Sequence, residues 1–197
     1  FEMDITPVTM PDGTVVSTDD GPRAGVTLEA VSQLKPVFRE DGRVTAGNAC
    51  PLNDGAAAVV VMSRKRAEEL GITPLARVIA SSVSALNPEI MGLGPIEAIK
   101  RVLARANMTM SDIDLVEINE AFAAQVIPSA DELGIDMVNQ LNVNGGAIAL
   151  GHPFGQTGAR IMTTLINGLQ DSDKTFGLES MCVGGGQGMA MVVERLV

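Results

Sequence analysis

Apolar residues follow two different patterns along the chain. Residues 56–62 (AAAVVVM) form an unbroken apolar run rich in β-branched side chains, which is typical of a strand buried on both faces. The segment that starts at Pro95 instead has apolar residues at helical spacing, namely Ile96, Ile99, Leu103 and Ala106. On its polar side Glu97 and Arg101 lie four residues apart, where such a pair stabilises a helix. The chain therefore combines buried strands with amphipathic helices.

The same patterns predict the remaining elements. We expect further helices over 27–34, 64–70 and 121–133 and around Ile161, Leu165 and Leu169, and further strands over 76–82, 115–118, 175–182 and 188–194. Ser63 suits the N-cap of the helix over 64–70, and Gly71 suits its end. Residues 1–50 and 142–158 are rich in turn-forming residues and predict loops. Strands that alternate with helices predict a mostly parallel, layered α/β domain that ends in an antiparallel hairpin.

Composition excludes several classes of function. The 197 residues are 46% hydrophobic and 19% charged, which is enough for a sizeable core and unlike a disordered chain. A net charge of -10, without a cluster of Lys or Arg, argues against a nucleic-acid partner. Five Phe and no Trp or Tyr argue against a stacking platform for single strands. One His and two Cys cannot fill a structural zinc site, so we expect no metal.

Targeting features are equally sparse. The longest uncharged run, from Met137 to Ala159, contains five Gly and several Asn and Gln, so we do not expect it to enter a membrane. No signal peptide opens the chain, and two Cys do not form a disulfide framework, which favours a cytoplasmic location. The chain begins at Phe1 with FEMDITPV, without an initiator Met, and we expect it to be part of a longer protein.

Three segments place reactive side chains at strand ends or in glycine loops. They are Asn119 to Ala123, Asn144 to Pro153, and Cys182 to Gly188. Taken singly, the Asn could be a helix cap, the His a structural residue, the Cys a core residue and the triple Gly a hairpin turn. Neither phosphate-loop motifs nor a nucleophile elbow are present. Together, a thiol, an imidazole, a carboxamide and glycine N–H groups suit acyl transfer through an oxyanion.

Four motifs in register resemble the thiolase family. They are VTAGNACPLNDGAAA, NEAFA, NVNGGAIALGHP followed by x-G-x-T-GAR, and C-x-GGG-x-G, and the resemblance runs from Leu34 to the C-terminus. It implies an α/β thiolase fold of layered αβαβα type, to which this chain supplies mainly the C-terminal half. Residues 1–51 would be the end of the CoA-contacting loop domain, and 52–73 a strand and helix that complete the N-terminal domain. Residues 74–197 would be the C-terminal domain.

The resemblance also implies roles for individual residues. His152 would activate a nucleophilic cysteine, and Asn119 would hold a water that forms the first oxyanion hole with His152. Cys182 would be the general acid/base, and the N–H of Gly184 would contribute to a second oxyanion hole. A second set would line the site of coenzyme A: Phe38, Ala46 and Phe122 beside the pantetheine, and Cys50 where the family usually has Ser. The basic residues available for the CoA phosphates before residue 50 are Arg23, Lys35, Arg39 and Arg43.

The implied activity is that of an acyltransferase in lipid metabolism. A complete enzyme would cleave a 3-oxoacyl-CoA with CoA to acetyl-CoA or propionyl-CoA and a shortened acyl-CoA, or run the reverse Claisen condensation. CoA would be a substrate and no cofactor would be permanently bound. CPLNDGAAA and GHPFGQTGAR look most like degradative thiolases of fatty acids or steroid side chains. Neither Cys50 nor Cys182 matches the motif of the nucleophile, which would belong to an N-terminal half absent here.

The resemblance leads to two further expectations. This chain alone would be inactive, and the full enzyme would be a homodimer or homotetramer without a membrane or nucleic-acid partner. The alternative is a thiolase-like protein that binds acyl-CoA or a sterol without catalysis. The joint presence of Asn119, His152 and Cys182 argues against it, because a binding module would not need all three.

Overall fold

The protein is described by a computed structural model that covers residues 3–197; Phe1 and Glu2, where the first predicted domain begins, lie outside the described residues. A four-stranded sheet forms its centre. Its strands are β3 (Ala76–Ala85), β4 (Leu115–Ile118), β5 (Phe176–Val183) and β6 (Gln187–Arg195), and its main helices are α3 (Gly94–Ala106), α4 (Ala123–Leu133) and α6 (Thr157–Asp171). The predicted strands and helices over residues 74–197 are all present, with ends that shift by a few residues.

The order of the strands is β3-β6-β5-β4, and only β4 and β5 are parallel. The strands β5 and β6 form the predicted hairpin, and β6 inserts between β5 and β3, antiparallel to both. The expectation of a mostly parallel sheet is therefore wrong. A hairpin whose second strand lies inside the sheet makes two of its neighbouring pairs antiparallel, although β3, β4 and β5 all run the same way.

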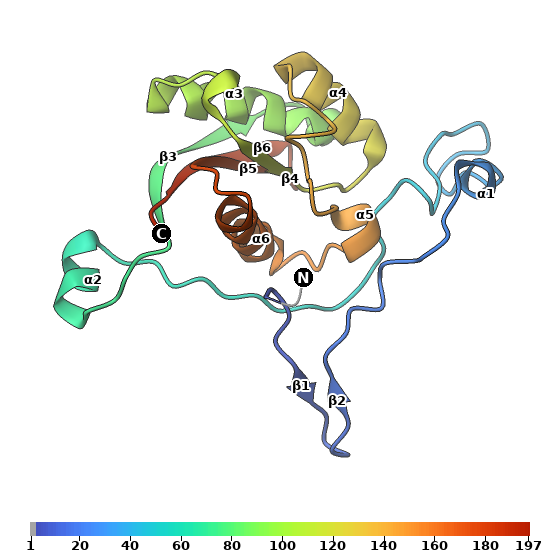
Figure 1. The fold of residues 1–197 in the computed structure, drawn as a ribbon. Coiled ribbons are helices and arrows are strands. Elements are labelled where there is room, and N and C mark those ends of the chain that lie inside the picture. Colours follow the sequence, from blue (N-terminus) through green and yellow to red (C-terminus); the bar gives the residue numbers. More distant parts are fainter. Residues whose placement is uncertain (1–2) are drawn as a thin grey trace.

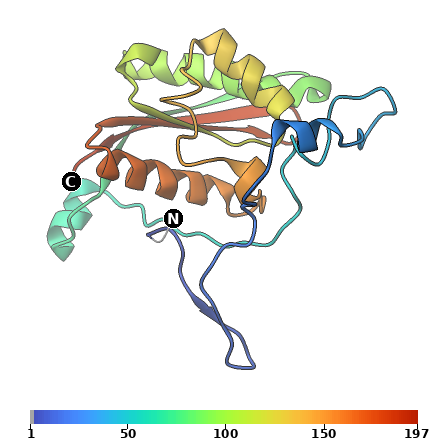
Figure 2. The same cartoon turned by 45° about the vertical axis from the view of Figure 1, so that its right-hand side comes forward.

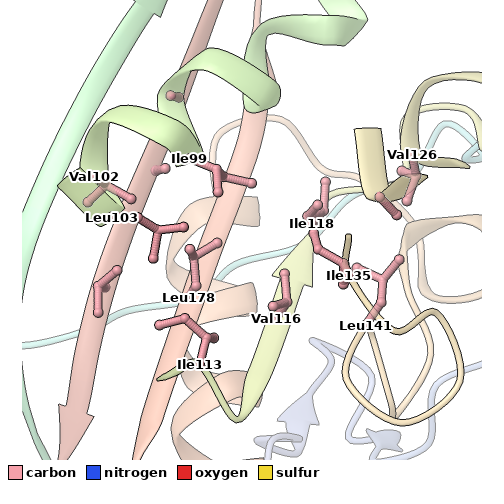
Figure 3. Packing of buried hydrophobic residues seen from close by; sticks show 14 residues of the cluster. Ile99, Val102, Leu103, Ile113, Val116, Ile118, Val126, Ile135, Leu141 and Leu178 are labelled. Atoms are coloured by element: carbon pink, nitrogen blue, oxygen red, sulfur yellow. The ribbon is translucent and has the colours of Figure 1, made fainter. Parts of the chain in front are cut away.

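Helices cover both faces of the sheet (Figures 1 and 2). On one face α3 and α4 enclose the larger core, in which Ile99, Val102 and Leu103 of α3 pack against the strands (Figure 3). On the other face Leu165 and Leu169 of α6 pack with strand residues. Ile99, Leu103, Leu165 and Leu169 are positions that the apolar periodicity predicts, whereas Val102 is an addition from the structure. The result is a helix–sheet–helix sandwich that fixes the ends of β4 and β5, where the candidate site lies.

The helix starts also follow the sequence. Pro95 lies in the first turn of α3, and Glu97 accepts a hydrogen bond from Nε of Arg101 at 2.7 Å. In α2 (Arg64–Leu70) the Ser63 hydroxyl accepts from the backbone N–H of Arg66, and Gly71 ends the helix with φ of +64°. The predicted caps and the predicted ion pair are confirmed.

The first 75 residues pack less against the sheet. The strands β1 (Val8–Thr9) and β2 (Val15–Val16) form a short hairpin that projects from the body, and α1 (Leu28–Ser32) begins after its N-cap Thr27 (Figure 1). An extended segment then crosses beneath α6 to α2 (Figure 1). Among residues 3–197, no helix has the length and apolar character needed to cross a membrane.

The strand predicted over 56–62 is wrong for this chain. Those residues have no regular secondary structure, and Val60 and Val61 are 85% and 79% exposed. A strand needs hydrogen-bonding neighbours and cover for its apolar faces, and no described strand lies beside this run.

Three short helices were not predicted. They are the 3-10 helices η1 (Pro88–Leu93) and η2 (Met110–Asp112) and the four-residue helix α5 (Ala147–Leu150). Helix α5 lies inside the stretch predicted as a loop over 142–158, and α6 begins at Thr157, within that same stretch. A single helical turn has too few residues to show a periodicity.

Candidate active site

Asn119 lies where β4 ends and the chain turns toward α4. Its backbone N–H donates to the carbonyl of Ser180 on β5 at 3.0 Å, and the residue is only 1% exposed. Both polar atoms of its carboxamide are buried and have no hydrogen-bond partner within residues 3–197. Buried polar groups are nearly always satisfied, by protein or by water, so this carboxamide is available to a ligand or to an ordered water.

Cys182 lies on the neighbouring strand, two residues beyond Ser180. It is buried, and burial raises the pKa of its thiol; a backbone hydrogen bond opposes this rise in part, and nearby Cys50 adds a smaller raising effect. Burial likewise raises the pKa of Cys50, whose backbone N–H donates to Ala121 at 3.1 Å. The two thiols are therefore protonated at neutral pH, the state that a proton donor needs.

His152 lies between α5 and α6. Its backbone N–H donates to Oδ1 of Asn53 at 2.9 Å, and its Nδ1 is 2.7 Å from Oγ1 of Thr157. Burial lowers the pKa of the imidazole, and the charge of Arg160 lowers it further. The ring is therefore neutral near pH 7, as a general base must be.

An open cleft of about 360 Å³ borders His152. Its other lining residues are Leu52, Asn53, Asp54 and Phe154, so neither Asn119 nor Cys182 belongs to it. The ring of Phe154 packs on His152 with centroids 4.8 Å apart. The structure thus brings Asn119, Cys182 and Cys50 to one region and places His152 beside this separate opening.

Glu120 joins the two regions. Its Oε1 accepts from Nδ2 of Asn142 at 2.8 Å, and its Oε2 accepts from the backbone N–H of Ile148 at 3.1 Å. A side chain at Gly146 would overlap the Glu120 carboxylate. The turn after β4, which carries Asn119, is therefore locked to α5, which ends two residues before His152.

Gly184 lies in the tight connection between β5 and β6. It is exposed, and no atom lies within 4 Å of the position that a Cβ would take. The side-chain amide of Gln187 donates to the Gly184 carbonyl at 3.1 Å. This leaves free space beside its backbone for an incoming group.

The predicted CoA-contacting residues are only partly brought together. Phe38 and Phe122 meet edge to face with centroids 6.0 Å apart, and Phe38 remains 70% exposed. Cys50 is held against the turn that carries Phe122, next to the β-bridge between Ala49 and Phe122. Ala46 lies on an exposed turn, and no described contact joins it to the two rings.

Sequence reasoning missed several polar residues that build this region. Four of them, Asn53, Glu120, Asn142 and Thr157, lie within the thiolase-like motifs, but the motifs assign them no role. The buried Glu117 was also missed, although a charged residue in a four-residue apolar strand was a visible signal. Burial raises the pKa of Glu117 to about 8, while Arg160, whose Nη1 lies 4.0 Å from Oε2, opposes the shift.

No group of three or more His, Cys, Asp or Glu side chains that could hold a metal ion occurs within residues 3–197.

Comparisons with protein families match most of the chain. The family described as "Thiolase, N-terminal domain" matches residues 1–65, and "Thiolase, C-terminal domain" matches residues 72–195. Acetyl-CoA acetyltransferases of Thiocystis violacea and Escherichia coli are 50% and 49% identical over 200 and 199 residues. Each match covers 100% of this chain and 50% of the relative. The chain therefore spans about half the length of these relatives.

Solved structures agree with the sequences. The acetyl-CoA acetyltransferase of Bacillus anthracis superposes with a TM-score of 0.93 at 47% identity, over 97% of this chain and 49% of that chain. Human mitochondrial 3-ketoacyl-CoA thiolase in complex with CoA superposes with a TM-score of 0.89 at 41% identity, over 96% of this chain and 48% of that chain. The α/β sandwich described above is thus a thiolase-fold domain, and the chain belongs to the thiolase family.

Proposed function

We propose that this chain is the C-terminal part of a CoA-dependent thiolase. The complete enzyme cleaves a 3-oxoacyl-CoA with CoA, releasing acetyl-CoA or propionyl-CoA and a shortened acyl-CoA, or runs the reverse condensation. The observation that carries the proposal is the buried carboxamide of Asn119, which has no partner within residues 3–197 and lies beside the strand of Cys182. A folded chain rarely tolerates such a group unless something binds to it.

The proposed roles of the polar groups follow from their protonation states and from the hydrogen bonds that they can still form. The Asn119 carboxamide donates to a water that faces a thioester oxygen, and neutral His152 accepts the proton of a nucleophilic thiol. Cys182, protonated because burial raises the pKa of its thiol, delivers a proton to the α-carbon or to the leaving thiolate. The N–H of Gly184 binds the second oxyanion, for which the open space at this glycine leaves room.

CoA is the thiol substrate in this proposal. The edge-to-face pair of Phe38 and Phe122 supplies an apolar wall for the pantetheine. Ala46 and Cys50, which follow Phe38 in the sequence, belong to the same proposed site. The candidates for its phosphates are the exposed bases Arg23, Lys35, Arg39 and Arg43. A relative of this chain is a thiolase solved in complex with CoA, which supports the choice of ligand.

The nucleophilic cysteine belongs to a partner half in this proposal. Residues 1–51 are the end of the loop domain, 52–73 complete the N-terminal thiolase domain, and 74–197 are the C-terminal domain. The exposed apolar run at 59–61 supports a partner that covers it. The complete enzyme is a cytoplasmic homodimer or homotetramer, and the chain alone is inactive.

The test combines this chain with a separately produced thiolase half that carries a nucleophilic cysteine. We expect CoA-dependent loss of the enolate absorbance of acetoacetyl-CoA; a 3-oxoacyl-CoA with a steroid side chain tests the degradative assignment. Cys182→Ala should lower turnover by roughly 10²- to 10⁴-fold. Met181→Leu, on the other face of β5, is the matched control. Undiminished turnover in Cys182→Ala would refute its role, and CoA binding without turnover in the wild type would favour a non-catalytic protein.

A further inference from the structure

Thr157 is the one described residue that forms a hydrogen bond with the ring of His152. It is the first residue of α6 and has no exposed surface. Its Oγ1 lies 2.7 Å from Nδ1 of His152 and also contacts the carbonyl oxygen of Pro153, at 3.0 Å. Neither the sequence motifs nor the proposed mechanism gave this hydroxyl a role.

The direction of the Thr157 hydroxyl proton decides which nitrogen of the His152 ring carries a proton. A threonine hydroxyl carries one hydrogen, whereas a carbonyl oxygen can only accept. Two oxygens 3.0 Å apart repel each other unless a hydrogen lies between them, so the Thr157 proton belongs to the contact with Pro153. In the shorter contact Oγ1 must then accept, and Nδ1 of His152 must be the donor.

We propose that Thr157 is a positioning residue that holds His152 in the tautomer protonated at Nδ1. A neutral imidazole has only one N–H, so Nε2 is left with its lone pair. The inference rests on the proposed function for its consequence: Nε2 is the atom that takes the proton of the nucleophilic thiol. The S–H bond breaks, an Nε2–H bond forms, and the products are a thiolate and an imidazolium whose Nδ1–H still donates to Thr157.

The backbone around His152 fixes this geometry. The N–H of Gln156 donates to the Pro153 carbonyl at 3.0 Å and closes the turn from His152 to Thr157. Gly151 has φ of +89°, and a side chain there would overlap Asn53, whose Oδ1 accepts from the His152 N–H. The ring and the hydroxyl are therefore held at the two ends of the six-residue segment from His152 to Thr157.

The direct test is the tautomer itself. His152 is the only histidine of the chain, so ¹⁵N-histidine labelling gives one imidazole, whether the chain is alone or bound to an unlabelled second half. We expect long-range ¹H–¹⁵N correlations of the Nδ1-protonated form in the wild type and in Thr157→Ser. Thr157→Val, which removes the acceptor, should shift the population toward the Nε2-protonated form. The control is Thr163→Val, because the Thr163 hydroxyl of the same helix donates only to the Ala159 carbonyl.

Turnover in the combined enzyme is the second measurement. We expect Thr157→Val to lower kcat by roughly 10- to 100-fold, the usual effect of losing a positioning partner, with a smaller change in KM. Thr157→Ser should restore most of the loss, and unfolding temperatures of all variants check their folds. A wild-type ring protonated at Nε2, or a Thr157→Val ring with unchanged tautomer, would overturn the inference even if the enzyme is active. An inactive wild type with the expected tautomer would instead refute the proposed function alone.

Discussion

Two buried asparagines near the end of β4 differ in how their carboxamides are satisfied. Asn142 donates to the carbonyl of Ile118 and to Glu120 and accepts from the Ile118 N–H, all within 2.9 Å. Asn119 makes no side-chain hydrogen bond within the described residues. The first carboxamide stabilises the fold, whereas the second is retained at a cost in stability of about 1–3 kcal/mol.

This difference predicts that replacement by Leu has different effects on stability at the two positions. Asn119→Leu, which keeps the approximate volume, should leave the free energy of unfolding unchanged or raise it by about 1 kcal/mol, and should abolish turnover. Asn142→Leu should lower the free energy of unfolding by about 2–3 kcal/mol, because the partners of its amide are left unsatisfied. Denaturant unfolding of both variants measures the effects. A clear loss of stability in Asn119→Leu would show that its carboxamide is structural.

Glu179 is a half-buried residue whose carboxylate lacks a full set of partners. One of its carboxylate oxygens has no hydrogen-bond partner within residues 3–197, and burial raises the pKa of its carboxyl group to about 8 from an ordinary value of 4.5. Between these values the unfolded chain releases a proton that the folded chain keeps. The contribution of Glu179 to the free energy of unfolding therefore becomes less favourable as pH rises from 4.5 to 8.

Glu179→Gln removes this penalty. The variant should match the wild type near pH 4.5 and be more stable at pH 8 by roughly 1–3 kcal/mol, less than the full shift implies because the side chain keeps some solvent contact. Urea unfolding at both pH values measures the difference. Glu68→Gln on the exposed face of α2 is the control for a general effect of removing charge. An equal gain at both pH values would rule out titration of Glu179 as the cause.

Among the elements, α3 and β6 meet through glycines. A side chain at Gly188 of β6 would overlap the carbonyl of Gly94, the first residue of α3, and that carbonyl also accepts from the Ser84 hydroxyl at 2.8 Å. Gly188 pairs with Cys182 across the hairpin. The close approach of α3 therefore also fixes the strand end that carries the thiol.

Gly188→Ala should lower the free energy of unfolding by about 2–4 kcal/mol, because backbone on both sides must move. Gly184→Ala should change it by less than about 1 kcal/mol, since its Cβ meets no atom within 4 Å. Thermal unfolding of the two variants tests this contrast within one hairpin. Equal losses would mean that hairpin flexibility, and not the contact with α3, sets the cost.

Elements whose signals lie within one segment were predictable. Ser63 and Gly71 bound α2, Pro95 lies in the first turn of α3, and the four residues of β4 match the predicted range. The position of β6 inside the sheet was not predictable, because the apolar run at 189–193 indicates a buried strand but not which strands lie beside it. The strand predicted over 56–62 was wrong because strand formation depends on neighbouring strands as well as on the residues of the segment itself.

The site residues likewise divide into those marked by a local sequence signal and those whose partners depend on the tertiary structure. Glycine loops and strand ends drew attention to Asn119, His152 and Cys182, whose catalytic roles stay predictions. Glu120 and Thr157 were not predicted to bind their partners, because Ile148 and His152 are brought to them by tertiary structure. A polar residue at a helix start looks like a cap in sequence, whatever it contacts in the fold.

At the scale of the whole molecule, the exposed segment at 59–61 is the observation that supports the proposed partner half. Val60 is 85% exposed within an apolar run, whereas the four-stranded sheet has its own core on both faces. An apolar run of this kind is typical of a surface that a partner covers. Val138, 81% exposed on the loop after α4, offers the same side chain outside such a run.

Val60→Lys and Val138→Lys therefore form a matched pair, each changing the net charge of -10 by the same unit. In the chain alone both should change the free energy of unfolding by less than about 0.5 kcal/mol, because both side chains are exposed. With a second thiolase half, Val60→Lys should weaken binding at least tenfold, since a buried, unpaired ammonium costs more than 1.4 kcal/mol. Val138→Lys should bind like the wild type. Titration by analytical ultracentrifugation or calorimetry measures both, and equal affinities would refute the proposal that the run at 59–61 is covered by that half.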